Sequence, residues 1–252
     1  MQPTPPSPLI LFQQGTIVVV NKPSGLLVHR SEIDRHETDF LLQRVRDVLG
    51  EPVYAVNRLD KPTSGIVLMT TDRTQVAGLS EALKHPESRK TYLAVVRGVI
   101  PESGLIDKPL KRIQDDYDPR PLKDPDALQE AQTRFTRLAQ CELPIAIDRY
   151  PTTRYSLARL DLLTGRRHQL RRHLKSLSHP IIGDTSYGKS LHNRLFTEQF
   201  QSHRLLLHAW HLELTHPETQ AHLSYTAPLC DQFSRVLEVL GWAPLLENLS
   251  RS

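Results

Sequence analysis

We predict an α+β fold for this chain, built on a large mixed, mostly antiparallel sheet flanked by helices and loops. Predicted strands outnumber predicted helices, and several strands follow one another directly, which is typical of this class. The 252 residues, of which 38% are hydrophobic, are enough for one sizeable core. We find no linker that would divide the chain. We therefore expect a single domain over residues 1–252, with the proline-rich residues 1–8 as a flexible tail.

The first elements follow from apolar patterns that are closed by turn residues. Residues 15–20 are largely β-branched, and a Pro-Ser-Gly turn closes them at Gly25. Apolar residues at helical spacing end at Gly50, the expected place of a C-cap. Asp72 can cap a helix, with Gln75 three residues later as in a capping box. These patterns predict strands over 15–20, 26–29, 54–59 and 66–70, and helices over 40–49 and 72–85.

Turn residues and apolar patterns also define the elements of the second half of the chain. Residues 111–126 are rich in charge and proline without a clear period, which predicts an exposed insertion. Thr164 and Gly165 lead into a short predicted helix, and a terminal amphipathic helix ends at Gly241. The predicted strands cover 89–99, 133–139, 153–163, 204–214 and 221–225, and the predicted helices cover 168–177 and 229–240.

The positive charge of the chain is concentrated in one stretch. The net charge is +4, but between Arg149 and Lys175 eight basic residues stand against one acidic residue, Asp161. Focused charge of this kind favours a polyphosphate partner. A solvated helix face gives the same pattern, and charge alone does not decide between the two.

Several classes of protein are disfavoured by composition. No apolar run reaches the roughly 20 residues of a membrane helix. Residues 1–8 lack the basic start of a signal peptide. Cys141 and Cys230 are far apart, and neither metal-ligand spacing nor a disulfide framework follows from them. We expect a protein of the reducing cytoplasm that needs no membrane and no metal.

Asp60 begins a tight turn at the end of a predicted strand. Pro62 fixes one φ angle of this turn, and Gly65 can adopt a φ that other residues rarely take. Such a turn would hold a carboxylate rigidly at a sheet edge. Because aspartates at turn starts usually bond to their own backbone, position alone favours a structural role for Asp60.

A set of ordered motifs changes this interpretation. Arg58-Leu59-Asp60, followed by Pro62-Thr63-Ser64-Gly65, resembles the catalytic signature of the RluA-type family of pseudouridine synthases. The other motifs that match this family in order are Asn21-Lys22-Pro23-Ser24-Gly25, Lys90-Thr91-Tyr92, the stretch from Thr164 to Arg171, and His179-Pro180-Ile181-Ile182-Gly183-Asp184. The resemblance covers residues 11–228. It implies a pseudouridine synthase catalytic domain with a cleft across the sheet, which isomerises uridine in RNA without a cofactor.

The resemblance also implies roles for individual residues. Asp60 would either attack the sugar covalently or take a sugar proton, and both routes stay open. Arg166 matches the arginine that pairs with this aspartate. Tyr92 would stack on the uracil and act as the base for its C5 proton. Arg58 would help to fill the gap that the extruded base leaves in the RNA.

A basic helix face is the predicted contact with RNA phosphates. His168, Arg171, Arg172 and Lys175 follow the helical spacing i, i+3, i+4 and i+7, which places them on one face. Such a face suits A-form phosphates, which proteins recognise mainly by shape. We count Gln169, in the same motif, among these RNA contacts, and we expect some of these residues to bond to protein carbonyls instead.

Within the family the chain is most similar to members that act on tRNA. The stretch from Arg149 to Tyr155 and the Arg171-Arg172 pair are typical of them. This implies a uridine at position 65, in the T-stem, as the substrate. We expect tRNA as the partner of a monomer that has neither a nucleotide cofactor nor an S4 RNA-binding domain. An rRNA pseudouridine synthase and a non-catalytic RNA-binding protein on the same fold are the alternatives.

One position departs from the family pattern. The signature normally opens with histidine, and here Asn57 takes that place. Asparagine can form hydrogen bonds but carries no charge. The supporting role of this position is therefore open.

Overall fold

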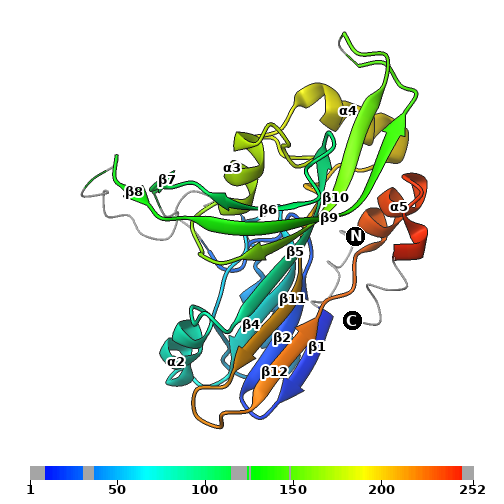
Figure 1. Ribbon diagram of the computed structural model, residues 1–252. Helices are drawn as coiled ribbons and strands as arrows, with labels where there is room; N and C mark the ends of the chain where they lie inside the picture. Colours follow the sequence, from blue (N-terminus) through cyan, green and yellow to red (C-terminus); the bar gives the residue numbers. More distant parts are fainter. Residues whose placement is uncertain (1–8, 31–36, 115–123, 125, 148, 246–252) are drawn as a thin grey trace, which may run out of the picture.

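The computed structural model describes residues 9–30, 37–114, 124, 126–147 and 149–245 (Figure 1). The tail expected over residues 1–8 and most of the predicted insertion lie outside the described residues. The strands are β1 (Leu9–Gln14), β2 (Ile17–Lys22), β3 (Tyr54–Ala55), β4 (Ser64–Thr70), β5 (Arg89–Arg97), β6 (Ser103–Asp107), β7 (Leu110–Lys111), β8 (Leu128–Gln129), β9 (Gln132–Leu143), β10 (Thr153–Leu162), β11 (Leu207–Thr215) and β12 (His222–Thr226). The helices are α1 (Leu41–Leu49), α2 (Gln75–Ala82), α3 (Gln169–Ser176), α4 (Ser190–Phe200) and α5 (Asp231–Val239).

A ten-stranded sheet forms the centre of the molecule. Its order is β1-β2-β4-β11-β5-β10-β9-β6, with β3 paired to β4 and β12 paired to β11. The strand pairs of this sheet within the described residues are antiparallel, except that β4 and β11 run parallel. The predicted α+β fold with a mixed, mostly antiparallel sheet is confirmed.

Most predicted elements exist, and the errors have identifiable causes. Leu27 forms only an isolated bridge with Phe40, so the strand predicted over 26–29 is wrong. The predicted capping box is also wrong, because the Asp72 carboxylate accepts the Thr74 N–H and α2 begins only at Gln75. Of the strand predicted over 54–59, only Tyr54 and Ala55 form a strand, β3. The chain then leaves the sheet before it reaches the Asp60 turn. β1, β6, β7, β8 and α4 were not predicted.

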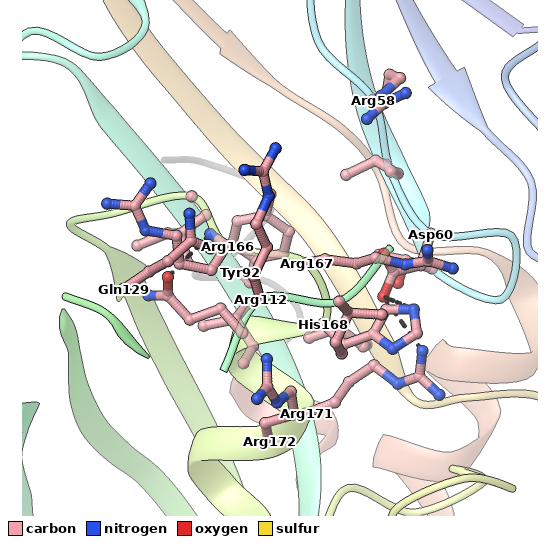
Figure 2. A pocket seen from close by; sticks show the side chains of 18 of the residues that line it. Arg58, Asp60, Tyr92, Arg112, Gln129, Arg166, Arg167, His168, Arg171 and Arg172 are labelled. Atoms are coloured by element: carbon pink, nitrogen blue, oxygen red, sulfur yellow. Dashed lines mark hydrogen bonds and ion pairs between the residues drawn. The ribbon is translucent and has the colours of Figure 1, made fainter. Parts of the chain in front are cut away.

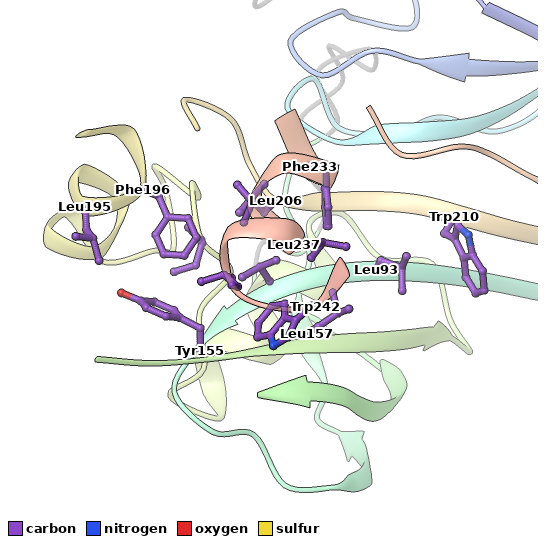
Figure 3. Packing of buried hydrophobic residues seen from close by; sticks show 14 residues of the cluster. Leu93, Tyr155, Leu157, Leu195, Phe196, Leu206, Trp210, Phe233, Leu237 and Trp242 are labelled. Atoms are coloured by element: carbon purple, nitrogen blue, oxygen red, sulfur yellow. The ribbon is translucent and has the colours of Figure 1, made fainter. Parts of the chain in front are cut away.

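The core consists of four hydrophobic clusters, two on each face of the sheet. Alternate residues along a strand point to opposite faces. Ala94 of β5 therefore joins the cluster under α3, while Leu93 joins the cluster under α4 and α5 (Figure 3). In β4, Val67 packs under α1 and Leu68 packs under α2. Helices thus cover both faces of the sheet.

Tyr92 lies where two hydrophobic clusters meet, the one under α1 (the α1 cluster) and the one under α3 (the α3 cluster). It packs against both of them, so these two clusters share one face. On that face the chain passes from β3 through the Asp60 turn into β4. The boundary between the two clusters is therefore the place where the fold brings the Asp60 turn, β5 and α3 together.

Gly65 permits the close approach of β4 and β11. Ser64 and Gly65 pair in parallel with His208 and Ala209. The φ of Gly65 is +110°, and a Cβ at this position would lie 2.1 Å from the carbonyl oxygen of Ala209. Only glycine fits this junction. The last residue of the catalytic-type signature is therefore required by the backbone.

Candidate active site

The turn that carries Asp60 is fastened to the turn around Ser24. The backbone N–H of Gly25 donates to the carbonyl of Lys61 over 2.9 Å, and the Ser24 hydroxyl donates to the carbonyl of Pro62 over 2.6 Å. The two Lys-Pro turns of the sequence therefore bind each other. Because these bonds fix the two residues that follow Asp60, its backbone is held in one place beside the sheet.

Lys22 is fully buried beneath the same turn. Its ammonium donates to the carbonyls of Leu26 and Lys61 over 2.7 and 3.0 Å. Burial and the nearby guanidinium of Arg204 lower the pKa of Lys22 to about 7, although the charge of Asp60 acts to raise it. The charge under the turn therefore changes near neutral pH.

A chain of hydrogen bonds ties the start of β4 to β11. Nη2 of Arg204 donates to the Ser64 hydroxyl over 2.6 Å, and this hydroxyl lies 2.7 Å from Nδ1 of His208. Since a guanidinium only donates, the Ser64 hydroxyl accepts from Arg204 and donates its own hydrogen bond to Nδ1 of His208, and Nε2–H of His208 donates to the carbonyl of Ala227 over 3.2 Å. Burial lowers the pKa of His208 to about 3; the Ala227 carbonyl opposes this effect, and Arg204 adds to it. His208 is therefore a neutral acceptor.

The Asp60 carboxylate is bound by Arg171, not by Arg166. Nη1 of Arg171 lies 3.2 Å from Oδ2 of Asp60, and Nε2 of His168 lies 3.9 Å from the same oxygen. The predicted Asp60–Arg166 pair is wrong, because Arg166 precedes α3 and its Nε donates to the carbonyl of Glu130 over 2.9 Å. The carboxylate is 25% exposed, so the pair is only partly shielded from solvent.

Asp184 in turn holds Arg171. The guanidinium donates twice, from Nε to Oδ2 over 2.8 Å and from Nη2 to Oδ1 over 2.9 Å. Burial acts to raise the pKa of Asp184, but Arg171 and the backbone N–H groups of Tyr187 and Ser186 outweigh burial and hold the pKa below its ordinary value. Burial acts to lower the pKa of Arg171, and the two carboxylates raise it. One cation thus serves two carboxylates.

Arg171 points inward because of the way α3 packs. Leu170 and Leu174 are buried under the helix, and Arg171 lies at the edge of this apolar stripe. Only 4% of Arg171 is exposed. Gln169 is 2% exposed, and its amide donates to the carbonyl of Gln132 over 2.9 Å. The prediction that Arg171 and Gln169 face RNA phosphates is therefore wrong.

The other members of the predicted basic face lie nearer the surface. Arg172 is half-buried, and Lys175 is exposed. His168 lies at the N-cap of α3 and not in the helix, with a φ of 54° in the left-handed region. Its Nδ1 is 3.0 Å from the hydroxyl of Tyr187. Burial lowers the pKa of His168, and Asp60 opposes this effect. That these three residues contact RNA stays a prediction.

Tyr92 belongs to β5 and lies close to Asp60. Its neighbours across the sheet are Leu160 on β10 and Ala209 on β11. Burial and the negative charge of Asp60 both raise the pKa of Tyr92, so the phenol keeps its proton at neutral pH. The ring offers a flat apolar surface to the cavity that Asp60 also lines.

A cavity of about 430 Å³ opens at Asp60 and Tyr92 (Figure 2). This volume lies within the range of about 300–1,000 Å³ that is usual for ligand sites. Among the described residues that line the cavity, Asp60 is the one carboxylate. The cationic lining residues are Arg58, Lys111, Arg112, Arg166, Arg167, Arg171 and Arg172. This excess of positive charge favours a polyanionic ligand.

One wall of the cavity comes from the strands β7 and β8, which we call the β7–β8 arm (described residues 108–114 and 126–131). Lys111, Arg112, Ile113 and Gln129 of this arm line the cavity. Three arginines at the start of α3 and within it donate to backbone carbonyls of the arm. The pairs are Arg166 to Glu130, Arg167 to Gln114 and Arg172 to Lys111. These arginines therefore shape the cavity by holding its wall.

Asn57 performs a supporting role without charge. The backbone N–H of Leu68 donates to Oδ1 of Asn57 over 2.7 Å, and the N–H of Val56 donates to the carbonyl of Leu68 over 2.9 Å. The segment that leads to Asp60 is thus attached to β4. A neutral imidazole nitrogen can accept the same bond, so asparagine can replace histidine here.

Sequence reasoning did not assign roles to Lys22, Asp184, Arg204 or Arg112. The first three carried a signal, because each is a charged residue beside a run of apolar residues, where burial demands a partner. Arg112 carried none, since it lies in a charged stretch without a period. Its place in the cavity follows from the path of the β7–β8 arm.

Within the part of the chain that the structure describes, no group of three or more His, Cys, Asp or Glu residues is arranged to hold a metal ion. None of the described helices has the length and apolar composition to cross a membrane.

This chain is similar in sequence to known pseudouridine synthases. Residues 16–176 match the family model described as RNA pseudouridylate synthase. The tRNA pseudouridine synthase C of Pasteurella multocida is 45% identical over 92% of this chain and 96% of that protein. The enzyme of the same name from Vibrio cholerae is 43% identical over 92% of this chain and 96% of its own length.

Two solved human structures resemble the fold. RNA Pseudouridylate Synthase Domain Containing 4 aligns with a TM-score of 0.68 at 27% identity, over 92% of this chain and 93% of that one. RNA Pseudouridylate Synthase Domain Containing 1 aligns with a TM-score of 0.69 over 100% and 98% of the two chains. Its 22% identity supports the fold alone.

Proposed function

Because this chain belongs to the RNA pseudouridylate synthase family, we propose that it isomerises a uridine in tRNA to pseudouridine, with Asp60 as the reacting carboxylate. The observation that carries the proposal is that, among the described residues of the cavity, the one carboxylate is paired with Arg171 and the other charged side chains are cationic. The cations attract RNA, and the carboxylate is placed to act on it.

The reaction breaks the N1–C1′ bond of uridine, turns the uracil and joins C5 to C1′. No electron is gained or lost, so we propose chemistry without a redox cofactor. Asp60 either attacks C1′ or removes a sugar proton, and both routes need the ionised carboxylate. Within the described residues, Arg171 and His168 both approach Oδ2. We therefore assign Oδ1 to the substrate.

Tyr92 is proposed to pack against the uracil. Its ring lies beside Asp60 and keeps its proton at neutral pH, because its pKa is raised. It can accept the C5 proton only if its own phenolic proton leaves in the same step. We assign this transfer to Tyr92. The phenolic proton leaves to solvent in the open cavity, and N1 of the uracil, freed from C1′, takes up one proton from solvent, so the isomerisation balances.

The RNA contacts are proposed for the cationic rim. Arg58 is exposed at the cavity, two residues before Asp60, where it can enter the gap left by an extruded base. Extrusion costs a few kcal/mol, and such an insertion offsets part of that. The tRNA pseudouridine synthase C relatives support tRNA as the substrate. We propose the uridine at position 65, in the T-stem.

We propose that the protein is a monomer that acts in the cytoplasm, because a single chain already supplies Asp60, Tyr92 and the cationic lining of the cavity. Gel filtration of the purified protein tests the first point: an apparent mass near 28.8 kDa is expected, and a stable dimer would contradict it.

Pseudouridine mapping tests the substrate. Total RNA from cells with and without this gene would be sequenced after pseudouridine-specific chemistry. Loss of a mark in the tRNA T-stem is the expected result. Loss confined to rRNA would favour the alternative of an rRNA enzyme, and no loss would favour a non-catalytic RNA-binding protein. A tRNA transcript with cytidine at position 65 is the matched control for the purified protein, and it should remain unmodified.

A further inference from the structure

We propose that Asp184 is a positioning residue for the isomerisation: it sets the rotation of the Arg171 guanidinium so that Nη1 meets Asp60. This inference rests on the proposed function. Asp184 has no place in the chemistry above, and its side chain is 0% exposed. It acts on Asp60 only through Arg171.

The geometry of a guanidinium makes this role specific. Its donors lie in one plane, and a carboxylate that binds two of them fixes the direction of the rest. Asp184 takes the edge formed by Nε and Nη2 of Arg171, at 2.8 and 2.9 Å. Nη1 then projects toward Asp60, at 3.2 Å from Oδ2. The ring of Tyr187 lies against the guanidinium, with its centroid 5.1 Å from Cζ, and limits tilting of the plane.

Asp184 itself is held from several sides. Its Oδ1 accepts the backbone N–H groups of Ser186 and Tyr187 over 2.9 Å each. Its backbone carbonyl accepts the side-chain amide of Asn193 over 2.9 Å, and Oδ1 of Asn193 accepts the N–H of Gly183 over 2.8 Å. The loop between Ile181 and α4 therefore forms a rigid base for the Asp184 carboxylate.

The turn before Asp184 is equally constrained. The φ of Gly183 is +79°, and a Cβ there would lie 1.8 Å from the carbonyl oxygen of Arg204. The Gly183-Asp184 pair in the sequence thus has a physical explanation. Glycine brings the loop against Arg204, and aspartate uses that fixed position to orient Arg171.

Without Asp184, Arg171 keeps only the partly exposed Asp60 as an anionic partner among the contacts described above. The guanidinium is then free to rotate about its side-chain torsions. A misplacement of about 1 Å in a reacting group can cost on the order of 100-fold in rate. The loss should fall on the rate at saturating RNA, because the buried Asp184 side chain does not line the cavity.

The test is a double-mutant cycle of Asp184→Asn and Arg171→Met, measured as single-turnover rates on saturating tRNA. Asp184→Asn should lower the rate at least about tenfold and leave the Kd for tRNA within about threefold. The double variant should be no slower than Arg171→Met, since Asp184 acts through Arg171. An unchanged rate in Asp184→Asn, or the same loss repeated in the Arg171→Met background, would overturn the proposal.

Asp161→Asn is the matched control. Asp161 accepts the Thr91 hydroxyl over 2.9 Å and lies 3.7 Å from Arg159, but it does not line the cavity. The single-turnover rate of Asp161→Asn should match that of the wild type. If Asp184→Asn does not fold, Asp184→Glu answers the same question, because the extra methylene displaces the guanidinium while keeping the charge. A wild-type rate in that folded variant would overturn the proposal.

A crystal structure of Asp184→Asn separates this inference from the proposed function. In this variant the distance between Nη1 of Arg171 and the Asp60 carboxylate should exceed about 3.5 Å, which is outside hydrogen-bond range, while the Asp60 turn stays unchanged. An unmoved guanidinium would refute the positioning role even if the protein modified no tRNA. A wild-type protein that modifies neither tRNA nor rRNA would refute the proposed function alone.

Discussion

Replacement of His208 by glutamine should remove part of the acid sensitivity of the fold. His208 is 1% exposed, and its pKa is about 3, compared with an ordinary value of 6.5. Between these values the unfolded chain binds a proton that the folded chain does not, so stability rises with pH in this window and is lost as pH falls. The slope is about 1.4 kcal/mol per pH unit, which amounts to roughly 2 kcal/mol between pH 6.5 and pH 5.

The assay is urea unfolding of the wild type and His208→Gln at half-unit steps from pH 7 to pH 5. Glutamine can still accept from Ser64 and donate to the Ala227 carbonyl, so the variant should fold, and its stability should depend less steeply on pH than that of the wild type. His203→Gln, at an exposed histidine, is the control for the loss of a histidine elsewhere. Parallel slopes for wild type and His208→Gln would refute the assignment of a buried neutral imidazole.

Three further predictions follow from the same geometry. Between pH 7 and 9, Lys22 should contribute a rise in stability of about 1.4 kcal/mol per pH unit, because the unfolded Lys22 keeps a proton that the folded residue, with a pKa of about 7, releases; Lys22→Met should flatten this rise, and equal slopes in urea titrations would contradict it. Gly65→Ala should destabilise the fold by several kcal/mol through the clash with Ala209, whereas Gly15→Ala, in open space, should cost about 1 kcal/mol; equal melting temperatures would contradict the close approach. Arg166→Ala should raise KM for tRNA more than it lowers kcat, because Arg166 holds the β7–β8 arm and not Asp60; a loss confined to kcat would restore the predicted Asp60–Arg166 pair.

The sheet and most of its strands could be predicted from the sequence because their signals are local. The β-branched run of β2 and the apolar spacing of α1, closed by Gly50 with a φ of 70°, are patterns that a folded backbone must satisfy. α4 gave a weaker signal. It mixes polar residues with Leu195 and Phe196, which pack because α5 and β10 lie beneath them.

Local sequence patterns predict only part of the candidate active site. Asp60 and Tyr92 were expected in one place and lie there, because the ordered motifs of the family fix them in the fold. The partner of Asp60 was misassigned because Arg166 and Arg171 belong to one motif, and only the packing of Leu170 and Leu174 decides which arginine turns inward. That packing was visible in the apolar spacing of α3, and it contradicted the expected basic face.

The rate of Asp60→Asn on tRNA tests most directly whether Asp60 carries the reaction. The substitution removes the negative charge and changes the volume little. Purified wild type and variant would be compared by single-turnover conversion of a tRNA transcript and by filter binding of the same RNA. We predict no measurable pseudouridine with the variant and a Kd within about threefold of wild type, because the other charged residues that line the cavity remain. Appreciable isomerisation by Asp60→Asn would contradict the assignment of Asp60.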